Sequence, residues 1–507
     1  MTWNKALICS GLIALVPWAS VHAAASVPKA TCRSGRADRP ESGLQGMTTQ
    51  AEQDSGANKQ GFTCNTDLVG QFQGEGGSWQ FTAWKTCGYF DTSNNAAQQH
   101  LGTLVVDASD PSHPVVTEYL TTASMLDPWE SLKVHGGRQL LAGGQRGGPG
   151  FSIYDISRDC RHPVLLADVN LPGSFGHTGE FAPDGKTYYI TPLRSSPSLV
   201  AVDVSDPSNP RELLLWTAPS PLNPIFHDLE ISDDGNTGYF TQFGGATAQN
   251  GLLILDTSDI QARRSNPQIR VIGQLSWDDG SIGAQQPLRV KIAGKPYIIF
   301  TDEGGLHASG CAAGKSPNGF ARIIDISDPA NPRVVSKLML EMNDPANCSQ
   351  TASGPADTAT GVSVFGYSSH YCNVDDRNNA TTAACSYFSA GLRIFDIHDV
   401  NNPKEIGYYK PPARGTDVLP GSQYYRFAGA NFNRPMDWTT SRPSFPKDRG
   451  MSSGDIWFSS QDNGFQIVKL HTNSGGCSAT GGSLAPFFAL ALIPMLFHRR
   501  RGRVRRC

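Results

Sequence analysis

Residues 104–111 read LVVDASDP, a short hydrophobic strand that ends in an aspartate and continues into a Ser-Asp-Pro turn. Five further copies of this unit follow along the chain of 507 residues. The anchoring aspartates are separated by 48, 48, 53, 69 and 71 residues and are Asp107, Asp155, Asp203, Asp256, Asp325 and Asp396. Self-similarity at a period of roughly 45 to 50 residues is typical of repeat arrays in which each unit is one small sheet.

Each repeat is predicted to contain four strands. In the third copy, β-branched and aromatic residues alternate over residues 177–182, 187–192, 199–204 and 212–217, and Gly, Pro, Asn and Asp separate these runs. The turn Asp184-Gly185 between the first two runs favours a tight hairpin. Four antiparallel strands in one repeat correspond to one blade of a β-propeller.

Two further segments set the number of blades. Residues 464–469 occupy the third-strand position of a seventh copy, with Lys469 in place of the aspartate, and no fourth strand follows them. Near the other end, residues 68–72 (LVGQF) match the fourth-strand segment 271–275 (VIGQL). We therefore expect an all-β, seven-bladed propeller of four-stranded antiparallel blades over residues 67–472. An N-terminal strand would complete the last blade and leave no open sheet edge.

The repeated strand-Asp-x-Ser-Asp-Pro unit resembles that of the LVIVD-repeat proteins of bacterial and archaeal surfaces. The resemblance covers roughly residues 68–470. It implies a β-propeller at the cell surface, and it implies no particular reaction.

Both ends of the chain carry features of export. Residues 1–25 have a lysine, an apolar stretch and three final alanines, as in a secretory signal peptide. Residues 26–66 form an N-terminal extension. Residues 473–507 combine Gly-Gly motifs, an apolar run shorter than a membrane span and an arginine cluster. This tail resembles GlyGly-CTERM and MYXO-CTERM sorting tails, which implies cleavage by an envelope protease; the alternative is a simple membrane anchor.

These features predict a protein exported through the inner membrane of a Gram-negative bacterium. It would reach the cell surface, the outer envelope or the medium, held transiently in the membrane by its tail. Removing both terminal segments leaves 35 basic and 45 acidic residues, a net charge of −10. A chain this acidic has no electrostatic footprint for nucleic acid, so nucleic-acid binding is excluded.

Eight cysteines remain between the two terminal segments, an even number that favours disulfides in an oxidising compartment. Cys372 and Cys385 flank the first hairpin of the sixth blade and could face each other. Cys311 and Cys348 both lie in inserted loops and form a second candidate pair. The pairing of the other four cysteines is left open.

The extra residues of the later repeats fall in loops on one face of the ring: residues 302–318, 341–360 and 410–423. Insertions gathered on one face of a repeat protein usually build its binding face. We therefore expect a protein, glycan or small-molecule ligand on this long-loop face. Aromatic residues there could stack on sugars or grip a partner loop, and packing in the core is an equal alternative: Trp129, Tyr371, Tyr424 and Tyr425.

Three histidines, His177, His227 and His370, stand at equivalent places where inner strands of blades three, four and six begin. Imidazoles that converge on the channel mouth could bind one copper, iron or zinc ion. Glu180, Glu230 and Glu130 are candidates for outer-shell or acid and base roles. The alternative is that these polar residues only satisfy hydrogen bonds between blades.

The leading hypothesis is an exported β-propeller that acts as a binding or scaffolding module. The second is a metal-dependent oxidoreductase with axial histidine ligands, and a third is a lyase or hydrolase using Glu180 and Glu230. Turn chemistry explains the repeated aspartates better than calcium binding does, because their side chains can bond their own backbone.

Overall fold

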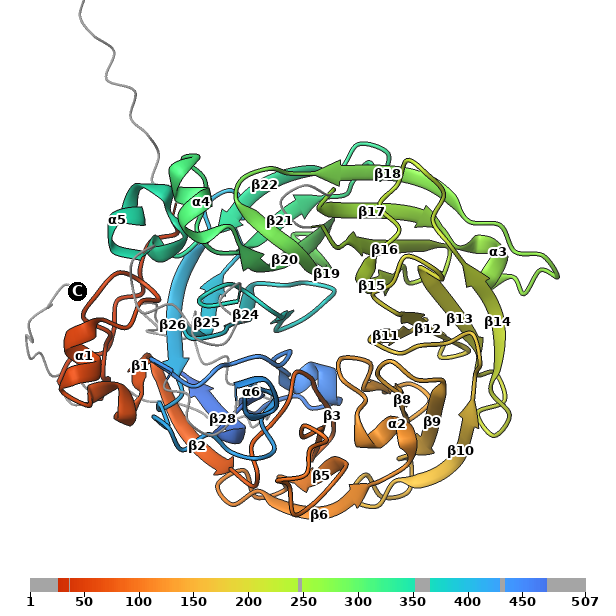
Figure 1. Ribbon diagram of the computed structural model, residues 1–507, viewed down its shortest axis with the longest axis horizontal. Helices are drawn as coiled ribbons and strands as arrows, with labels where there is room; N and C mark the ends of the chain where they lie inside the picture. The colour runs from red at the N-terminus through yellow and green to blue at the C-terminus, as the bar shows by residue number, and fades with distance from the viewer. Residues whose placement is uncertain (1–25, 36, 245–248, 352–364, 429–433, 472–507) are drawn as a thin grey trace, which may run out of the picture. The chain divides into compact units, whose positions relative to one another are not determined.

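The computed structural model describes residues 26–35, 37–244, 249–351, 365–428 and 434–471, and the sequence-predicted signal and sorting segments lie outside them. The chain divides into two units, residues 1–471 and 472–507. The first unit is a closed ring of seven antiparallel sheets around a central channel (Figure 1). The predicted all-β, seven-bladed propeller is confirmed.

Blades one to six each contain a regular meander of four strands. Their strands run from the channel outward in chain order: β3 (Phe81–Trp84), β4 (Cys87–Phe90), β5 (Thr103–Asp107), β6 (Val115–Leu120); β7 (Lys133–His135), β8 (Leu140–Gly144), β9 (Gly150–Asp155), β10 (Val164–Asn170); β11 (Thr178–Phe181), β12 (Thr187–Thr191), β13 (Leu199–Asp203), β14 (Arg211–Trp216); β15 (Phe226–Ile231), β16 (Thr237–Gln242), β17 (Gly251–Asp256), β18 (Arg270–Ser276); β19 (Ser281–Ile292), β20 (Lys295–Gly305), β21 (Ala321–Asp325), β22 (Arg333–Leu338); β23 (Cys372–Val374), β24 (Thr382–Tyr387), β25 (Gly391–Asp396), β26 (Lys404–Lys410).

The seventh blade joins the two ends of the ring. Its strands are β27 (Ile456–Ser460), β28 (Gly464–Leu470) and, outermost, the N-terminal strand β2 (Thr66–Phe72), which pairs with β28. The predicted closure is therefore confirmed. Residues 438–444 take the innermost position without forming a regular strand, and the backbone N–H of Ser444 donates to the Trp457 carbonyl at 2.7 Å.

The repeated aspartates are turn residues. In all six copies the aspartate carboxylate accepts a hydrogen bond from the backbone N–H two residues later, at 2.7 to 3.2 Å. The second aspartate of the motif does the same, as where Asp110 accepts from the N–H of Ser112 at 3.0 Å. The side chain thus replaces a backbone partner and fixes the sharp exit from the third strand.

A glycine in the fourth strand lets neighbouring blades approach. A Cβ added at Gly70 would lie 2.1 Å from the carbonyl oxygen of Pro111, in the turn of the first blade. Gly273 stands in the same relation to Pro329, also at 2.1 Å. This shared contact explains why LVGQF and VIGQL match in sequence. In both strands the Ser-Asp-Pro turn of the next blade packs on the glycine, where a side chain would clash.

Apolar side chains of adjacent blades interdigitate to form the cores. In one such cluster, Leu252 and Ile254 of β17 pack with Ile298 and Phe300 of β20. These residues are fully buried, and they come from the alternating inward positions of each strand. Stability therefore comes from the blade interfaces, which leaves the inner strand ends free to carry polar residues into the channel.

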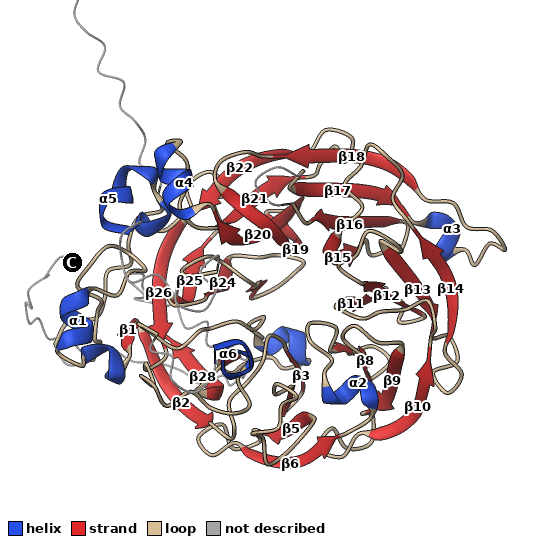
Figure 2. Cartoon of the chain, viewed as in Figure 1, coloured by secondary structure: helices blue, strands red, loops and turns tan. Residues whose placement is uncertain are grey.

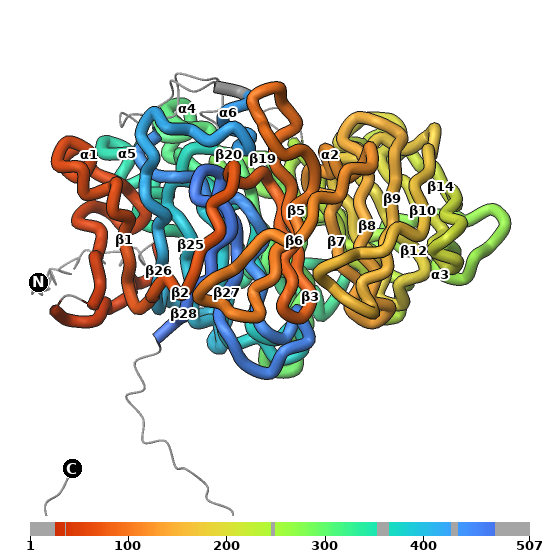
Figure 3. Tube along the Cα trace, turned by 90° about the horizontal axis from the view of Figure 1, so that it is seen from below, coloured from red at the N-terminus to blue at the C-terminus, as the bar shows by residue number. Residues whose placement is uncertain are grey.

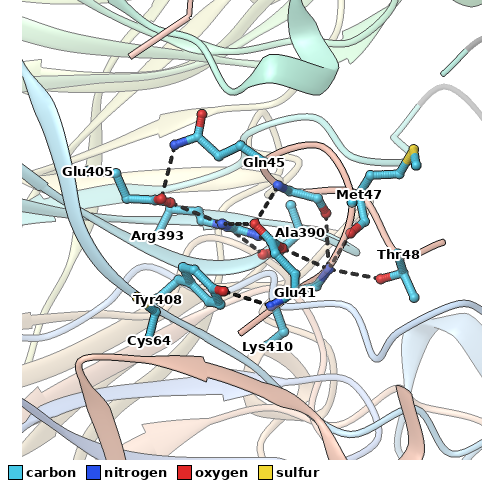
Figure 4. A network of polar contacts seen from close by, with 12 residues as sticks. Glu41, Gln45, Met47, Thr48, Cys64, Ala390, Arg393, Glu405, Tyr408 and Lys410 are labelled. Carbon is cyan, nitrogen blue, oxygen red and sulfur yellow. Dashed lines mark hydrogen bonds and ion pairs between the residues drawn. The ribbon is translucent and has the colours of Figure 1, made fainter. Parts of the chain in front are cut away.

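The N-terminal extension packs on the sixth blade. Its strand β1 (Phe62–Cys64) pairs with β26 and becomes a fifth strand of that sheet, and β1 and α1 lie beside β26 in both views (Figures 1 and 3). A buried ion-pair network ties the two together (Figure 4). Arg393 bonds Glu41 at 2.7 and 3.0 Å and Glu405 at 3.0 Å, while Lys410 lies 3.3 Å from Glu41.

Four disulfides staple the loops: Cys32–Cys64, Cys87–Cys160, Cys311–Cys348 and Cys372–Cys385. The two pairs expected from the sequence are both present. Four disulfides fit an extracellular or periplasmic protein. Among the described residues, none of the helices is long and apolar enough to cross a membrane.

The helices are short and belong to loops (Figure 2). They are α1 (Gln50–Asp54), α2 (Ala123–Leu126), α3 (Ser258–Gln261), α4 (His307–Ala312), α5 (Cys348–Thr351) and α6 (Gln423–Ala428), with 3-10 turns at Ala57–Gln60, Glu341–Asn343, Pro345–Asn347 and Pro446–Arg449. The Cys311–Cys348 bridge links α4 to the start of α5, and so ties together two of the inserted loops.

Candidate metal centre in the axial channel

The inner strands all enter the channel from the same end, so their first residues form one layer. Glu130 precedes β7, His177 precedes β11, His227 lies in β15, Gln285 in β19 and His370 just before β23. Figure 1 shows β3, β11, β15 and β19 around the channel. The structure therefore brings the three sequence-predicted histidines together.

A carboxylate stands in the middle of this layer. Glu130 Oε2 lies 3.2 Å from Nε2 of His177 and 3.1 Å from Nε2 of His227, and the two imidazole nitrogens are 3.0 Å apart. Glu130 and His227 are each 2 % exposed. These three atoms form a nearly equilateral triangle, and His177 is its partly exposed member, with 15 % of its side chain exposed.

His370 lies on the other side of the same carboxylate. Its Nε2 is 3.0 Å from Glu130 Oε1, 3.0 Å from the amide nitrogen of Gln285 and 3.5 Å from Glu303. Its Nδ1 contacts the carbonyl oxygen of Thr440. A carbonyl partner requires Nδ1 to carry a proton, so the ring is held in one orientation with Nε2 toward Glu130.

Neighbouring blades hold these residues in place through their backbones. The N–H of Glu130 donates to the carbonyl of His177 at 3.1 Å. Thr191, at the end of β12, donates its hydroxyl to the carbonyl of His227, and Thr301 of β20 donates to the carbonyl of His370 at 2.6 Å. The layer is thus fixed by the blade-to-blade bonds of the ring rather than by mobile loops.

The residue before Glu130 has an unusual backbone. Trp129 adopts a positive φ of 53°, which is rare for a bulky side chain. Its ring packs against the ring of His177, with centroids 5.9 Å apart, and under the guanidinium of Arg146. Such outliers persist where surrounding structure enforces them, and they cluster at functional sites.

Aromatic rings cover the layer on the long-loop side. Trp79 and Phe388 pack on His370 with ring centroids 5.4 and 5.0 Å away, and Trp438 packs on Phe388. Trp129, Tyr371 and Tyr424 are buried. Trp129 and Tyr424 belong to the hydrophobic cluster of this cover, and Tyr371 packs on His370. These three aromatics are therefore core residues, as the alternative expected, and stacking of sugars on them is not supported.

Burial and charge pull the pKa values of the layer in opposite directions. Burial by itself raises the pKa of Glu130, but the charge of His227 and the contacts with the other imidazoles outweigh it and hold that pKa well below the usual range. Burial lowers the pKa of His177. For His370, burial also acts to lower the pKa, yet Glu130 and Glu303 overcome it and raise the pKa to about 9. The layer therefore holds an ionised carboxylate among imidazoles of different proton affinity, with the pKa of His177 lowered and those of His227 and His370 raised.

The donor set fits a transition-metal ion. Glu130, His177 and His227 offer ligand atoms that all lie within 4.8 Å of one another. Two ligands bound at right angles with bonds of about 2.1 Å stand about 3 Å apart, close to the spacing found here. Within the described residues, Glu130 Oε2 is buried without a hydrogen bond of good geometry, as expected if a cation completes the site.

The sequence assigned partly different roles. Glu130 was a candidate outer-shell residue, whereas its carboxylate lies at the centre of the layer; His370 contacts the carboxylate from behind and is outside the group of mutually close ligand atoms. Glu180 and Glu230 do not reach the histidines. Three residues along an extended strand span about 10 Å, so these carboxylates lie deeper in the channel.

That deeper layer contains residues that sequence reasoning missed. Lys133 lies 3.7 Å from Glu180, Arg377 binds Glu230, and Arg442 lies 3.5 Å from Glu180. A signal was present: Lys133 follows Glu130 by three residues, as Glu180 follows His177 and Glu230 follows His227. The inner strands therefore repeat a two-layer pattern, one layer of potential ligands and one of charges.

Comparison with known proteins supports the repeat. The sequence model of the LVIVD repeat matches residues 97–122, 195–216 and 316–339. These segments contain the third and fourth strands of blades one, three and five. No curated protein matches the chain.

Solved structures share the fold at low identity. The chain is similar to Kuenenia stuttgartiensis hydrazine synthase (14 % identity, 66 % of this chain and 78 % of that one, TM-score 0.43). It is also similar to a hypothetical selenium-binding protein from Sulfolobus tokodaii (11 %, 63 % and 73 %, 0.43) and to the β-propeller domain of Myceliophteria thermophila Cps50 (10 %, 80 % and 98 %, 0.49). None of these similarities carries an argument about function. The chain is thus a seven-bladed β-propeller that contains LVIVD repeats.

Proposed function

We propose that this protein is an exported metal-dependent oxidoreductase with one transition-metal ion in its axial channel. Glu130, His177 and His227 would be the ligands, and His370 would hold the carboxylate of Glu130 from behind. The observation that carries the proposal is the mutual spacing of 3.0 to 3.2 Å between the three ligand atoms. Two histidines and one carboxylate on one side of an ion form the set used by non-haem iron oxygenases, which keeps positions open for other ligands.

The surrounding residues support a metal centre over a purely structural cluster. Hydrogen bonds between blades would need only pairs of complementary donors and acceptors, whereas here two imidazole nitrogens and one carboxylate oxygen all lie within 3.2 Å of one another, the spacing of ligands around one ion. His370 supplies a charged contact that orients the carboxylate, as outer-shell partners do around metal ligands. The aromatic cover limits access of water to the site.

Metal analysis of the protein purified without chelator tests the proposal. We expect about one equivalent of iron, copper or zinc, lost in Glu130→Gln, His177→Ala and His227→Ala. His113→Ala is the matched control, because His113 is exposed and outside the channel, and it should keep the metal. The ligand assignment fails if the three variants retain as much metal as the control, or if the wild type takes up none of these ions when incubated with them.

A second measurement addresses the oxidoreductase class. Iron-loaded protein with an open coordination position should bind nitric oxide and give an electron paramagnetic resonance signal that Glu130→Gln abolishes. Metal retained in the triad without any such signal would indicate a structural ion instead.

The second candidate is a binding or scaffolding module whose protein, glycan or small-molecule partner contacts the long-loop face. The bridge Cys311–Cys348 favours it, because it fixes two inserted loops relative to each other. The double variant Cys311→Ser and Cys348→Ser should bind fewer partners from envelope extracts and glycan arrays than the wild type. Unchanged binding by this variant would argue against the module.

Export and processing belong to the same proposal. Residues 1–25 would direct export, and an envelope sorting protease would recognise residues 473–507. Intact mass spectrometry of the protein from its native envelope should give a mass that lacks both segments. A mass that includes residues 473–507 would instead support a retained anchor.

A further inference from the structure

A cavity lies in the channel, beyond the candidate metal centre. It has a volume of about 320 Å³ and is lined by inner-strand residues and by the turns between first and second strands, on the face opposite the long loops. That volume is at the lower end of the range of roughly 300 to 1,000 Å³ for small-molecule sites. The cavity is therefore suited to a small ligand.

The charged residues of its wall balance in number. Four are basic and four are acidic, and they are Lys133, Arg289, Arg377, Arg442, Glu180, Glu230, Asp233 and Asp448. A ligand with a net charge would leave one sign in excess beside the buried members of this set, Lys133 and Glu230, which is costly. A ligand that carries one charge of each sign would keep the balance.

Several of these charges already have close partners within the protein. Arg377 binds both carboxylate oxygens of Glu230 at 2.9 Å, and Arg289 binds Asp233. Asp448 accepts hydrogen bonds from Asn373 and from the N–H of Phe445. These pairs form the wall and need nothing from a ligand.

Lys133 and Arg442 are different. The side chain of Lys133 is 5 % exposed, and that of Arg442 is 13 % exposed. Neither makes a hydrogen bond to any described residue through its charged group; their nearest acidic contacts are 3.5 to 3.7 Å away. Within the described part of the chain, both cations have only these long ion-pair contacts to Glu180 and Glu230 and no hydrogen bond shorter than them. Their N–H groups can therefore still bind an anionic group of a ligand.

Glu180 provides the complementary charge. Its Oε1 accepts from the N–H of Phe181 at 3.0 Å, while its Oε2 faces Lys133 and Arg442 beyond hydrogen-bond distance. A cationic group of a ligand could therefore bind Oε2. Apolar wall residues remain for the rest of the molecule: Phe81, Phe181 and Ile231.

We propose that this cavity binds a free α-amino acid with an apolar side chain. Its carboxylate binds Lys133 and Arg442, its ammonium group binds Glu180, and its side chain packs on the apolar wall. The site goes beyond the proposed metal centre and does not depend on it.

Calorimetric titration with three related probes tests this inference: L-phenylalanine, 3-phenylpropionate and phenethylamine. The first carries both charges, and the others lack the ammonium or the carboxylate. We expect saturable binding of L-phenylalanine, and affinities for the other two that are weaker by about tenfold or more, since each loses a charge-assisted hydrogen bond. Equal affinity for 3-phenylpropionate would overturn the assignment in favour of a simple anion site, and absence of binding by all three would overturn it entirely.

Variants locate the binding in the cavity. Arg442→Gln removes the positive charge and shortens the side chain, whereas Glu180→Gln removes the negative charge at nearly the same size. Each should weaken the binding of L-phenylalanine by about tenfold or more. Arg211→Gln, an exposed residue on β14 that binds Asp203, is the matched control and should bind as the wild type does. Unchanged affinity in the first two variants would refute the proposed contacts.

Two further experiments keep the inference testable if a variant fails to fold. Crystals of the wild type soaked with 4-bromo-L-phenylalanine should show the bromine by anomalous scattering among the apolar wall residues, and bromine only at other places would refute the site. His177→Ala should lose metal yet still bind L-phenylalanine. Loss of the metal centre and loss of the amino-acid site are thus distinguishable outcomes.

Discussion

Replacing Glu41 by glutamine should strongly destabilise the attachment of the N-terminal extension to the sixth blade. Glu41 is the carboxylate between Arg393 and Lys410, which are both fully buried (Figure 4). Burial acts to raise the pKa of Glu41, but the charges of Arg393 and Lys410 outweigh it and lower that pKa. The carboxylate is therefore ionised, and the amide of glutamine removes its charge.

The magnitude follows from the contacts that remain. Removing one partner of a buried ion pair costs about 3 to 5 kcal/mol. Arg393 keeps Glu405 and the carbonyl of Ala390, and Lys410 keeps the hydroxyl of Thr48 at 2.8 Å and two backbone carbonyls. Because neither cation is left wholly without acceptors, we expect a loss of about 3 kcal/mol in the free energy of unfolding.

Urea unfolding followed by tryptophan fluorescence measures the loss, and hydrogen exchange at residues 41–48 shows whether the extension is released locally. Asp159→Asn is the matched control, since Asp159 forms a two-bond ion pair with Arg161 that is exposed and should cost much less than the buried pair does. If Glu41→Gln cost no more than Asp159→Asn, the argument from burial would be refuted.

Three more outcomes are expected. Gly273→Ala should cost about 1 to 3 kcal/mol by urea unfolding, because its methyl group meets the Pro329 carbonyl, whereas Gly144→Ala, with its nearest neighbour at 3.5 Å, should cost less. Replacing Cys87 and Cys160 together by serine opens a loop of 73 residues and should lower the unfolding free energy by about 4 kcal/mol, seen as a lower urea midpoint; an unchanged midpoint would contradict this. Burial lowers the pKa of Lys410 from 10.5 to about 8, so between these pH values the unfolded chain holds the proton that the folded chain has lost. The unfolding free energy should therefore rise with pH across that window, by about 1.4 kcal/mol per unit at most, and this rise should be absent in Lys410→Met.

The fold could be predicted from the sequence because each repeat carries its own local turn motif. Each copy carries its own aspartate turn, and a turn of this kind depends on residues that are neighbours in the chain. The closing strand could also be predicted, since Gly70 and Gly273 each pack against the Ser-Asp-Pro turn of the next blade, and this shared contact gives the two strands similar sequences. Local signals that repeat identify both the blades and the way the ring closes.

The candidate site was only partly accessible. Equivalent positions of His177, His227 and His370 indicated convergence, but sequence cannot say which side chain reaches the centre of a channel. The position of each side chain depends on how all the blades pack together, and in the structure it is Glu130 that lies at the centre of the layer. The opposite charges of Lys133 and Glu180 come from different blades, so no local pattern could show that they meet.

The extension was the least accessible part. Glu41 and Arg393 are 352 residues apart in sequence, and nothing near Glu41 indicates a buried partner. Long-range ion pairs of this kind are set by packing, which leaves no periodic trace in the sequence.

The pairing of β2 with β28 also dictates an order of assembly. Residues 66–72 leave the ribosome early, yet their partner strand, residues 464–470, is among the last parts of the described chain to be made. Until then β2 presents an unpaired backbone edge, which invites pairing with other chains. Contacts this distant in sequence also slow folding. The incomplete chain is therefore most vulnerable to aggregation and proteolysis before the seventh blade has formed and closed the ring.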